Sequence, residues 1–133
     1  VGVAQRAFEL AIRYAQERET FGKPIAQHQL VQEKLADMYT RVEGARLLTY
    51  RAAELKDKGE RSDTEAAMAK LAASEAGHKN AEESLRIHGG FGFSKEYEIE
   101  RLYRDAPLLL IGEGTSDIQR MGIAKGLLKR FAI

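Results

Sequence analysis

One carboxylate stands out in the sequence because of the residues on either side of it. Glu113 lies between Gly112 and Gly114, directly after a run of aliphatic residues. Ser116 is followed three residues later by Gln119, which is the spacing of a capping box and predicts that a helix begins at Ser116. Glu113 is therefore expected on a tight turn before a helix N-terminus, where a carboxylate can be held in position for acid–base chemistry.

Two further segments contain residues suited to holding a ligand. The stretch "HGGFGF", residues 88–93, has glycines that permit the backbone to approach a flat or phosphate-bearing molecule closely. The stretch "ERETFGKP", residues 17–24, contains Arg18, whose guanidinium is suited to bidentate binding of a phosphate. Taken singly, each segment is explained as well by a glycine-rich or solvated helix end.

Composition and charge exclude several classes of function. The chain has no cysteine, and His28, His78 and His88 are too far apart to form a helical ligand pair, so no metal site is expected. Lys and Arg number 21 against 20 Asp and Glu, which gives no sign of a nucleic-acid or anionic-membrane surface. No apolar stretch approaches the roughly 20 residues that span a bilayer.

Apolar and small residues recur at helical spacing along almost the whole chain. The spacing predicts a first helix that ends near Phe21–Pro24 and a second that runs from about Val31 to Lys58. A capping box at Ser62 and Glu65 predicts the start of a third helix, which ends at Gly89-Gly90. A short helix is expected over about 95–105, and a last helix from Ser116 to about Phe131.

These elements predict an all-α, up-and-down helical bundle that occupies residues 1–133 as one domain. No segment alternates as a strand does, and no internal repeat is present. A length of 133 residues suits one domain but is small for a complete cofactor enzyme, and the first residue is not Met. We therefore expect the chain to be a piece of a longer protein.

Three segments, taken together and in this order, carry a family resemblance. "RETFGKPIAQHQ" (18–29), "IHGGFGFSKEYEIERLYRDA" (87–106) and "EGTSDIQR" (113–120) closely resemble the C-terminal domain of the acyl-CoA dehydrogenases. The resemblance extends from "VGVAQRA" to the final helix. It implies the last part of a flavoenzyme that also has an N-terminal helical domain and a middle β domain.

The resemblance implies how that enzyme works and where. FAD and the acyl-CoA substrate bind where the domains meet, the enzyme is a homotetramer, and electron-transfer flavoprotein accepts its electrons. Its compartment is the cytoplasm in a bacterium or the mitochondrial matrix in a eukaryote. A relative among the acyl-CoA oxidases, and a non-catalytic helical interaction module that keeps the fold, remain as alternatives.

In the family reaction a carboxylate removes the α-proton of the acyl thioester while the β-hydrogen leaves as hydride to FAD, which gives the 2,3-enoyl-CoA. The base must reach a carbon acid in a place kept dry. Glu113 matches the base position of many members, whereas a minority carry the base on a helix before Val1. Since the loop position here is itself a glutamate, the resemblance implies that Glu113 is the base, and Gly114 matches a residue at the substrate thioester.

The resemblance also implies which residues contact FAD. Arg18 matches an arginine that reaches the pyrophosphate of a neighbouring subunit's FAD, residues 86–90 match a segment along its ADP half, and residues 115–117 match the turn near the flavin, in keeping with anion binding at a helix start. The implied contacts are Arg18, Phe21, Gln29, Arg86, Ile87, His88, Gly89, Gly90, Thr115, Ser116 and Asp117.

Four positions depart from the family pattern. Gly112 replaces an aromatic residue that walls the acyl pocket, which implies a wider pocket. Arg86 stands where Gln is frequent, and Asp117 where Glu or Gln is common. Glu98 replaces a proline. The joint presence of Arg18, Gln29, Gly89, Gly90 and Glu113 favours the enzyme domain over the interaction module.

Overall fold

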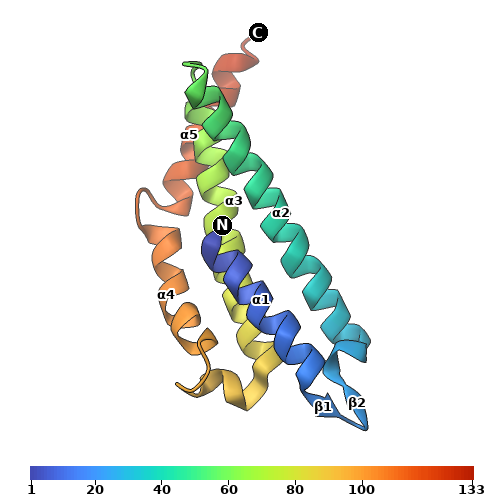
Figure 1. Ribbon diagram of the computed structural model, residues 1–133. Coiled ribbons are helices and arrows are strands. Elements are labelled where there is room, and N and C mark those ends of the chain that lie inside the picture. Colours follow the sequence, from blue (N-terminus) through green and yellow to red (C-terminus); the bar gives the residue numbers. More distant parts are fainter.

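Five α-helices form where small or apolar residues recur at helical spacing (Figure 1). The computed structural model describes residues 1–133. Its helices are α1 (Gly2–Glu17), α2 (Gln29–Asp57), α3 (Asp63–His88), α4 (Ile99–Ile111) and α5 (Ser116–Arg130). The predicted all-α bundle is confirmed. None of the helices has both the length and the apolar character needed to cross a membrane.

Short elements connect the helices. A hairpin of β1 (Glu19–Thr20) and β2 (Lys23–Pro24) follows α1 and leads into the 3-10 helix η1 (Ile25–Gln27). A second 3-10 helix, η2 (Gly89–Phe93), follows α3. The hairpin and η2 lie at the same end of the bundle (Figure 1). The hairpin was not predicted, because strands of two residues leave no alternating pattern in the sequence.

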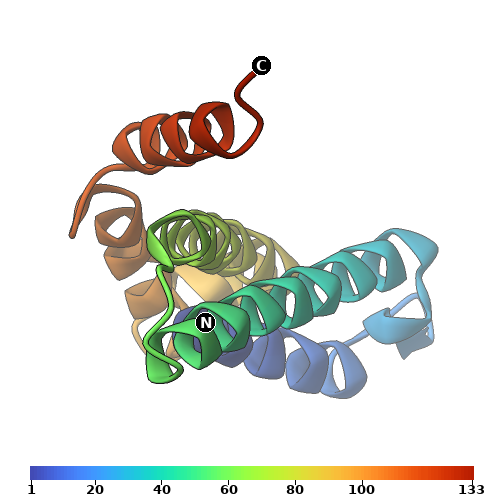
Figure 2. The ribbon, with the colours of Figure 1, turned by 90° about the horizontal axis from the view of Figure 1, so that it is seen from above.

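α3 is the central helix, with α1 and α2 on one side and α4 and α5 on the other (Figure 2). Small side chains allow its neighbours to approach closely: α1 buries four alanines, Ala4, Ala7, Ala11 and Ala15. On α3, Gly77 lies against Leu109 of α4, and Thr64 lies against Gly126 of α5. The position of every other helix is therefore set by its contact with α3.

Asn80 is a fully buried polar residue that joins three helices. Its side-chain amide donates to the carbonyl oxygens of Ala4 on α1 (3.2 Å) and Met38 on α2 (2.9 Å). Its Oδ1 accepts a hydrogen bond from Arg41 (3.3 Å). Because a buried amide is costly when unpaired, these bonds favour one arrangement of α1, α2 and α3 over others.

The predicted short helix over 95–105 is displaced in the structure. α4 begins at Ile99 and continues to Ile111, with Pro107 inside it. Proline removes one backbone N–H, and it therefore predicts a helix end near this position. The buried Ala106 beside it and the packing of Leu109 on α3 keep the helix intact past the proline.

Neither predicted capping box forms. Ser62 precedes α3 but makes no side-chain cap, and the Glu65 carboxylate instead accepts a hydrogen bond from Arg130 (2.7 Å). α5 begins at Ser116 as predicted, but its cap is Thr115, whose Oγ1 accepts a hydrogen bond from the backbone N–H of Ile118 (3.3 Å).

Candidate functional site

A hollow of about 460 Å³ lies at the end of the bundle that carries the hairpin. We call it the α1–α3 hollow. It is lined by Tyr14, Arg18, Thr20, Ile25, Ile87, His88, Gly89, Gly90 and Phe91. The structure thus brings together five of the candidate FAD contacts, from the end of α1 and the end of α3, which lie far apart in the sequence.

Arg18 supplies an unpaired positive charge to this hollow. It caps the C-terminus of α1 through its backbone N–H, which donates to the Tyr14 carbonyl (2.8 Å). Its guanidinium carbon lies 5.7 Å from the centre of the Phe91 ring, a cation–π distance. Arg13 on the same helix is paired with Glu17, whereas Arg18 makes no ion pair and is free to bind an anion.

The backbone of Gly89 and Gly90, which have no side chains, forms another part of the hollow. α3 ends at Gly89, whose φ of +58° lies in the region that glycine adopts most readily. A Cβ atom placed on Gly89 or Gly90 would meet no other atom within 4 Å, so the backbone there is open to a ligand. An unpaired guanidinium beside open backbone suits a phosphate-bearing molecule.

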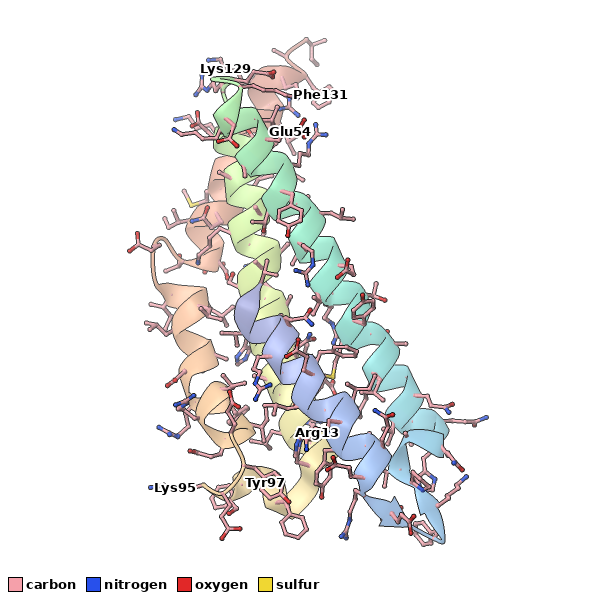
Figure 3. The ribbon with its side chains drawn as sticks, viewed as in Figure 1. Arg13, Glu54, Lys95, Tyr97, Lys129 and Phe131 are labelled. Carbon is pink, nitrogen blue, oxygen red and sulfur yellow. The ribbon has the colours of Figure 1, made fainter.

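His88 forms a wall of the hollow with its ring. The buried ring stacks on Tyr14 with centroids 4.3 Å apart and meets Tyr97 edge-on at 5.7 Å; Figure 3 shows Tyr97 at this end of the bundle. Nδ1 donates to the Ser84 carbonyl (2.7 Å). Burial lowers the pKa of His88, against an opposing effect of that hydrogen bond, and so favours the neutral ring.

Six candidate FAD contacts do not line the hollow; three of them, residues 115–117, lie near Glu113, and the other three are exposed. Phe21 is 96% exposed at the turn of the hairpin, where its ring meets His28 edge-on. Gln29 is exposed at the start of α2. Arg86 is also exposed, and its guanidinium donates to Glu82 on the same helix (2.7 Å).

The second group of candidate residues, 112–117, comprises the connection between α4 and α5 and the first two residues of α5; we call it the Glu113 loop. Glu113 has a φ of +56° and Gly114 a φ of +89°. For a residue with a Cβ atom this left-handed conformation costs about 1–2 kcal/mol. The Glu113 carboxylate has no hydrogen-bond or ion-pair partner and is exposed, so residues 1–133 do not by themselves provide the dry site expected for a base.

The rest of this loop leads into α5. Gly112 donates its backbone N–H to the Leu108 carbonyl (2.8 Å) and so closes α4. The Ser116 hydroxyl is buried without a partner, and the exposed Asp117 lies 3.4 Å from Arg120. The structure therefore places the six residues of the Glu113 loop together, around the α5 N-terminus.

A contact to this loop was missing from the sequence analysis. Lys70 on α3 donates to the carbonyl oxygens of Leu109 (2.9 Å) and Gly114 (2.7 Å). A lysine on an amphipathic helix gives no sequence signal for such a role, since its partners are backbone oxygens 39 and 44 residues away.

The two groups of candidate residues occupy separate parts of the chain. The Glu113 loop lies partway along the bundle, beside α3, whereas the α1–α3 hollow lies at the hairpin end (Figure 1). Neither group is closed by the chain's own residues. The structure is thus an all-α bundle with two separate groups of candidate residues, both open to solvent.

Comparison with known proteins identifies the family. The sequence profile of "Acyl-CoA dehydrogenase, C-terminal domain" matches residues 1–128, and the chain belongs to this family. It is 49% identical over 129 residues to 3-(aryl)acrylate reductase of Clostridium sporogenes, covering 97% of this chain and 34% of that protein. It is 48% identical over 130 residues to the caffeyl-CoA reductase–Etf complex subunit CarC of Acetobacterium woodii, covering 98% and 34%.

A solved structure shares the fold. Butyryl-CoA dehydrogenase from Megasphaera elsdenii superposes with a TM-score of 0.93 at 40% identity, over 96% of this chain and 33% of that protein. The chain thus spans about a third of the length of these relatives.

Proposed function

We propose that the chain is the C-terminal domain of an FAD-dependent acyl-CoA dehydrogenase, a longer flavoenzyme that oxidises an acyl-CoA thioester to the 2,3-enoyl-CoA. The observation that carries the proposal is the Glu113 carboxylate, which is unpaired and exposed on a left-handed turn before α5. A carboxylate held in this way is available to take a proton from a substrate brought against it.

Glu113 takes the α-proton of the acyl-CoA on its carboxylate. The electron pair of that C–H bond forms the new double bond as the β-hydrogen leaves. The oxidising chemistry would be supplied by bound FAD, to which the β-hydrogen would pass as hydride. Because Glu113 is exposed in this chain, the surface that excludes water from the reaction has to come from outside residues 1–133.

The residues present fit FAD. The α1–α3 hollow offers the unpaired Arg18 and the open backbone of Gly89 and Gly90 to a pyrophosphate. The Glu113 loop offers the buried, unpartnered Ser116 hydroxyl and the N-terminus of α5, which is favourable for a polar or anionic group.

The separation of the two groups of candidate residues supports an oligomer. The Glu113 loop lies partway along the bundle, whereas the α1–α3 hollow lies at its hairpin end (Figure 1), so the two groups are free to face the FAD molecules of different subunits. We propose that the hollow serves the FAD of a neighbouring subunit and the Glu113 loop serves the FAD of its own, in a homotetramer. Electron-transfer flavoprotein is the proposed electron acceptor, in keeping with the relative named as part of an Etf complex.

Gly112 supports a substrate that is bulky near the reacting carbons. It leaves the position beside Glu113 without a side chain. Two relatives have names that place an aromatic ring on the carbon chain next to the double bond, as in an aryl acrylate. We propose that the parent enzyme accepts acyl groups with a ring or branch at this place.

Glu113→Gln in the full-length, FAD-loaded protein tests the proposal. The amide keeps the size of the side chain but cannot take a proton, so flavin reduction on anaerobic mixing with butyryl-CoA or 3-phenylpropionyl-CoA should slow by at least ~10²–10⁴-fold. FAD content should not change. Glu96→Gln is the matched control, because Glu96 is also exposed and lies in a different connection. If the flavin of the Glu113→Gln variant were reduced at the wild-type rate, the base would have to be another residue.

A further inference from the structure

Lys70 has an unusual set of partners for a charged side chain. It is half-buried on α3 and makes no ion pair. Its ammonium group instead donates to two backbone oxygens, those of Leu109 (2.9 Å) and Gly114 (2.7 Å). Those two residues stand on either side of Gly112 and Glu113, so one side chain holds both ends of the turn.

Both oxygens are good acceptors for a cation. Leu109 is within the last four residues of α4, whose carbonyls have no partner within the helix, and a positive charge is favourable at that end. Gly114 lies just before α5, and its carbonyl also receives a longer bond from the Gln119 amide (3.4 Å), which in addition contacts the Glu113 carbonyl (3.2 Å). The loop is thus attached to α3 on one side and to α5 on the other.

The turn between these attachments needs external support. Glu113 has a φ of +56°, and a residue with a side chain keeps such a conformation only when its surroundings over-determine it. Among the side-chain hydrogen bonds to the Glu113 and Gly114 carbonyls, the one from Lys70 is the shortest and the only one with a charged donor. Without it, the longer bonds from Gln119 remain as the side-chain contacts to these carbonyls.

We propose that Lys70 is the positioning residue of the base: by binding the Leu109 and Gly114 carbonyls it holds the Glu113 turn in its left-handed conformation and aims the carboxylate at the substrate. The proposal rests on the proposed function of Glu113. Lys70 itself contacts neither the substrate nor the flavin in this scheme, and it acts through the loop.

Replacing Lys70 should lower the rate of proton removal more than it affects binding. Lys70→Met keeps the aliphatic stem and removes all donors. A displacement of about 1 Å in a reacting group can cost about 10²-fold, so we expect flavin reduction in the full-length enzyme to slow by about 10- to 100-fold at saturating acyl-CoA. FAD content and the acyl-CoA concentration at half-maximal rate should change little. Lys70→Arg, which keeps charge and donors, should recover most of the rate.

Three comparisons separate positioning from a general structural effect. Lys79→Met removes a lysine from the same helix whose partners are Glu82 and Glu83, and it should leave flavin reduction unchanged. In hydrogen exchange, Lys70→Met should speed exchange of amides 112–118 and leave those of α1 and α2 as in wild type. In a Glu113→Gln background, Lys70→Met should add little further loss, because the group it positions is already gone.

The outcomes are distinct. Wild-type flavin reduction in Lys70→Met, with Glu113→Gln inactive, overturns the role of Lys70 and leaves the proposed function intact. The role of Lys70 is also overturned if Lys70→Met slows flavin reduction as much in the Glu113→Gln background as it does in the wild-type enzyme. Wild-type reduction in Glu113→Gln overturns the proposed role of Glu113 as the base and, with it, the positioning role of Lys70. If Lys70→Met does not hold FAD, Lys70→Gln, which keeps a donor on a shorter stem, is judged by the same criteria.

Discussion

At Gly112 the backbone does not require a glycine. Its φ of −65° and ψ of 148° are open to any residue, and an added Cβ atom would lie 3.3 Å from the Leu108 carbonyl oxygen, a tight contact that a small shift relieves. The absence of a side chain therefore leaves space beside Glu113 without serving the turn. We therefore expect the glycine at this position to affect which acyl groups fit and not how the chain folds.

We expect Gly112→Tyr in the full-length enzyme to discriminate against bulky acyl groups. The ring should fill the space next to the base, so kcat/KM for 3-phenylpropionyl-CoA should fall by about 10-fold or more relative to that for butyryl-CoA, in line with the ~1–3 kcal/mol that small steric differences in a pocket are worth. Gly112→Ala is the control, because it adds the Cβ contact without the ring. Equal losses for both substrates in both variants would point to a disturbed loop.

His88 makes the stability of the bundle depend on pH. Burial lowers its pKa in the folded chain below the ordinary value near 6.5, so as pH falls through 6.5 the unfolded chain takes up a proton that the folded chain resists. The contribution of the neutral His88 ring to the free energy of unfolding is complete above pH 6.5 and is lost as the pH falls below that value. The lowered pKa values of Glu65, Glu83 and Glu98 matter only below about pH 4.5.

Urea unfolding of residues 1–133, followed by circular dichroism, should therefore show a falling free energy of unfolding between pH 7 and pH 5. His88→Gln should flatten this dependence, whereas His28→Gln, which changes a half-buried histidine, should keep it. An unchanged pH dependence in His88→Gln would show that other groups cause it.

At the scale of the elements, locally encoded features were predicted well. α2 ends at Asp57, next to the predicted end at Lys58, and α3 ends at His88, next to the predicted glycine stop at Gly89. The capping box at Ser62 failed because a group distant in sequence, Arg130, binds Glu65. At Ser116 the Gln119 amide donates instead to the nearby Glu113 carbonyl. Rules that consider one helix end at a time cannot predict a distant partner such as Arg130.

The candidate site divides in the same way. Residues that lie next to one another in sequence, such as Gly112 to Asp117, could be grouped without a structure. The proximity of Arg18 to Gly89 and Gly90 followed only from the family resemblance, since helix packing and not spacing brings them together. Lys70 was not foreseen at all, because backbone carbonyls that face a distant helix leave no mark in the sequence.

The approach of α5 to α3 depends on one glycine. A Cβ atom on Gly126 would collide with Oγ1 of Thr64 and lie 3.3 Å from its Cβ, whereas one on Gly122 of the same helix would meet nothing within 4 Å. Gly126→Ala should destabilise the chain by about 1–3 kcal/mol through overpacking. Gly122→Ala should stabilise it by up to about 1 kcal/mol through helix propensity.

Urea unfolding of both variants checks this pair. Thr64→Ala in the Gly126→Ala background should recover part of the loss, because it removes the colliding hydroxyl. Equal stability of the two alanine variants would mean that α5 does not pack on α3 as closely as the structure has it.

At the scale of the whole molecule, the chain exposes more surface than its size predicts. Its accessible surface is 8683 Å², against about 7,000 Å² for a compact monomer of this mass. α5 buries no residue and leaves Met121, Leu128 and Phe131 exposed; Figure 3 shows Phe131 at the end of the bundle opposite Tyr97. We infer that further protein surface covers these faces, as the proposed oligomer requires.

Retention of the cofactor should therefore depend on assembly, through Arg18. If its unpaired guanidinium binds the FAD pyrophosphate of a neighbouring subunit, Arg18→Ala in the full-length enzyme should keep its oligomeric state but lose FAD on dilution. A lost charge-assisted bond is worth about 1.5–3 kcal/mol, which corresponds to a roughly 10- to 150-fold weaker hold on FAD. Gel filtration with absorbance at 450 nm, over a range of enzyme concentrations, measures both properties. Arg13→Ala is the matched control, because it removes the same charge from α1 at a residue that is paired with Glu17 and lies outside the hollow. Full flavin occupancy in a monomeric parent protein would contradict the scheme, since a lone chain would then complete the site without a neighbour's arginine.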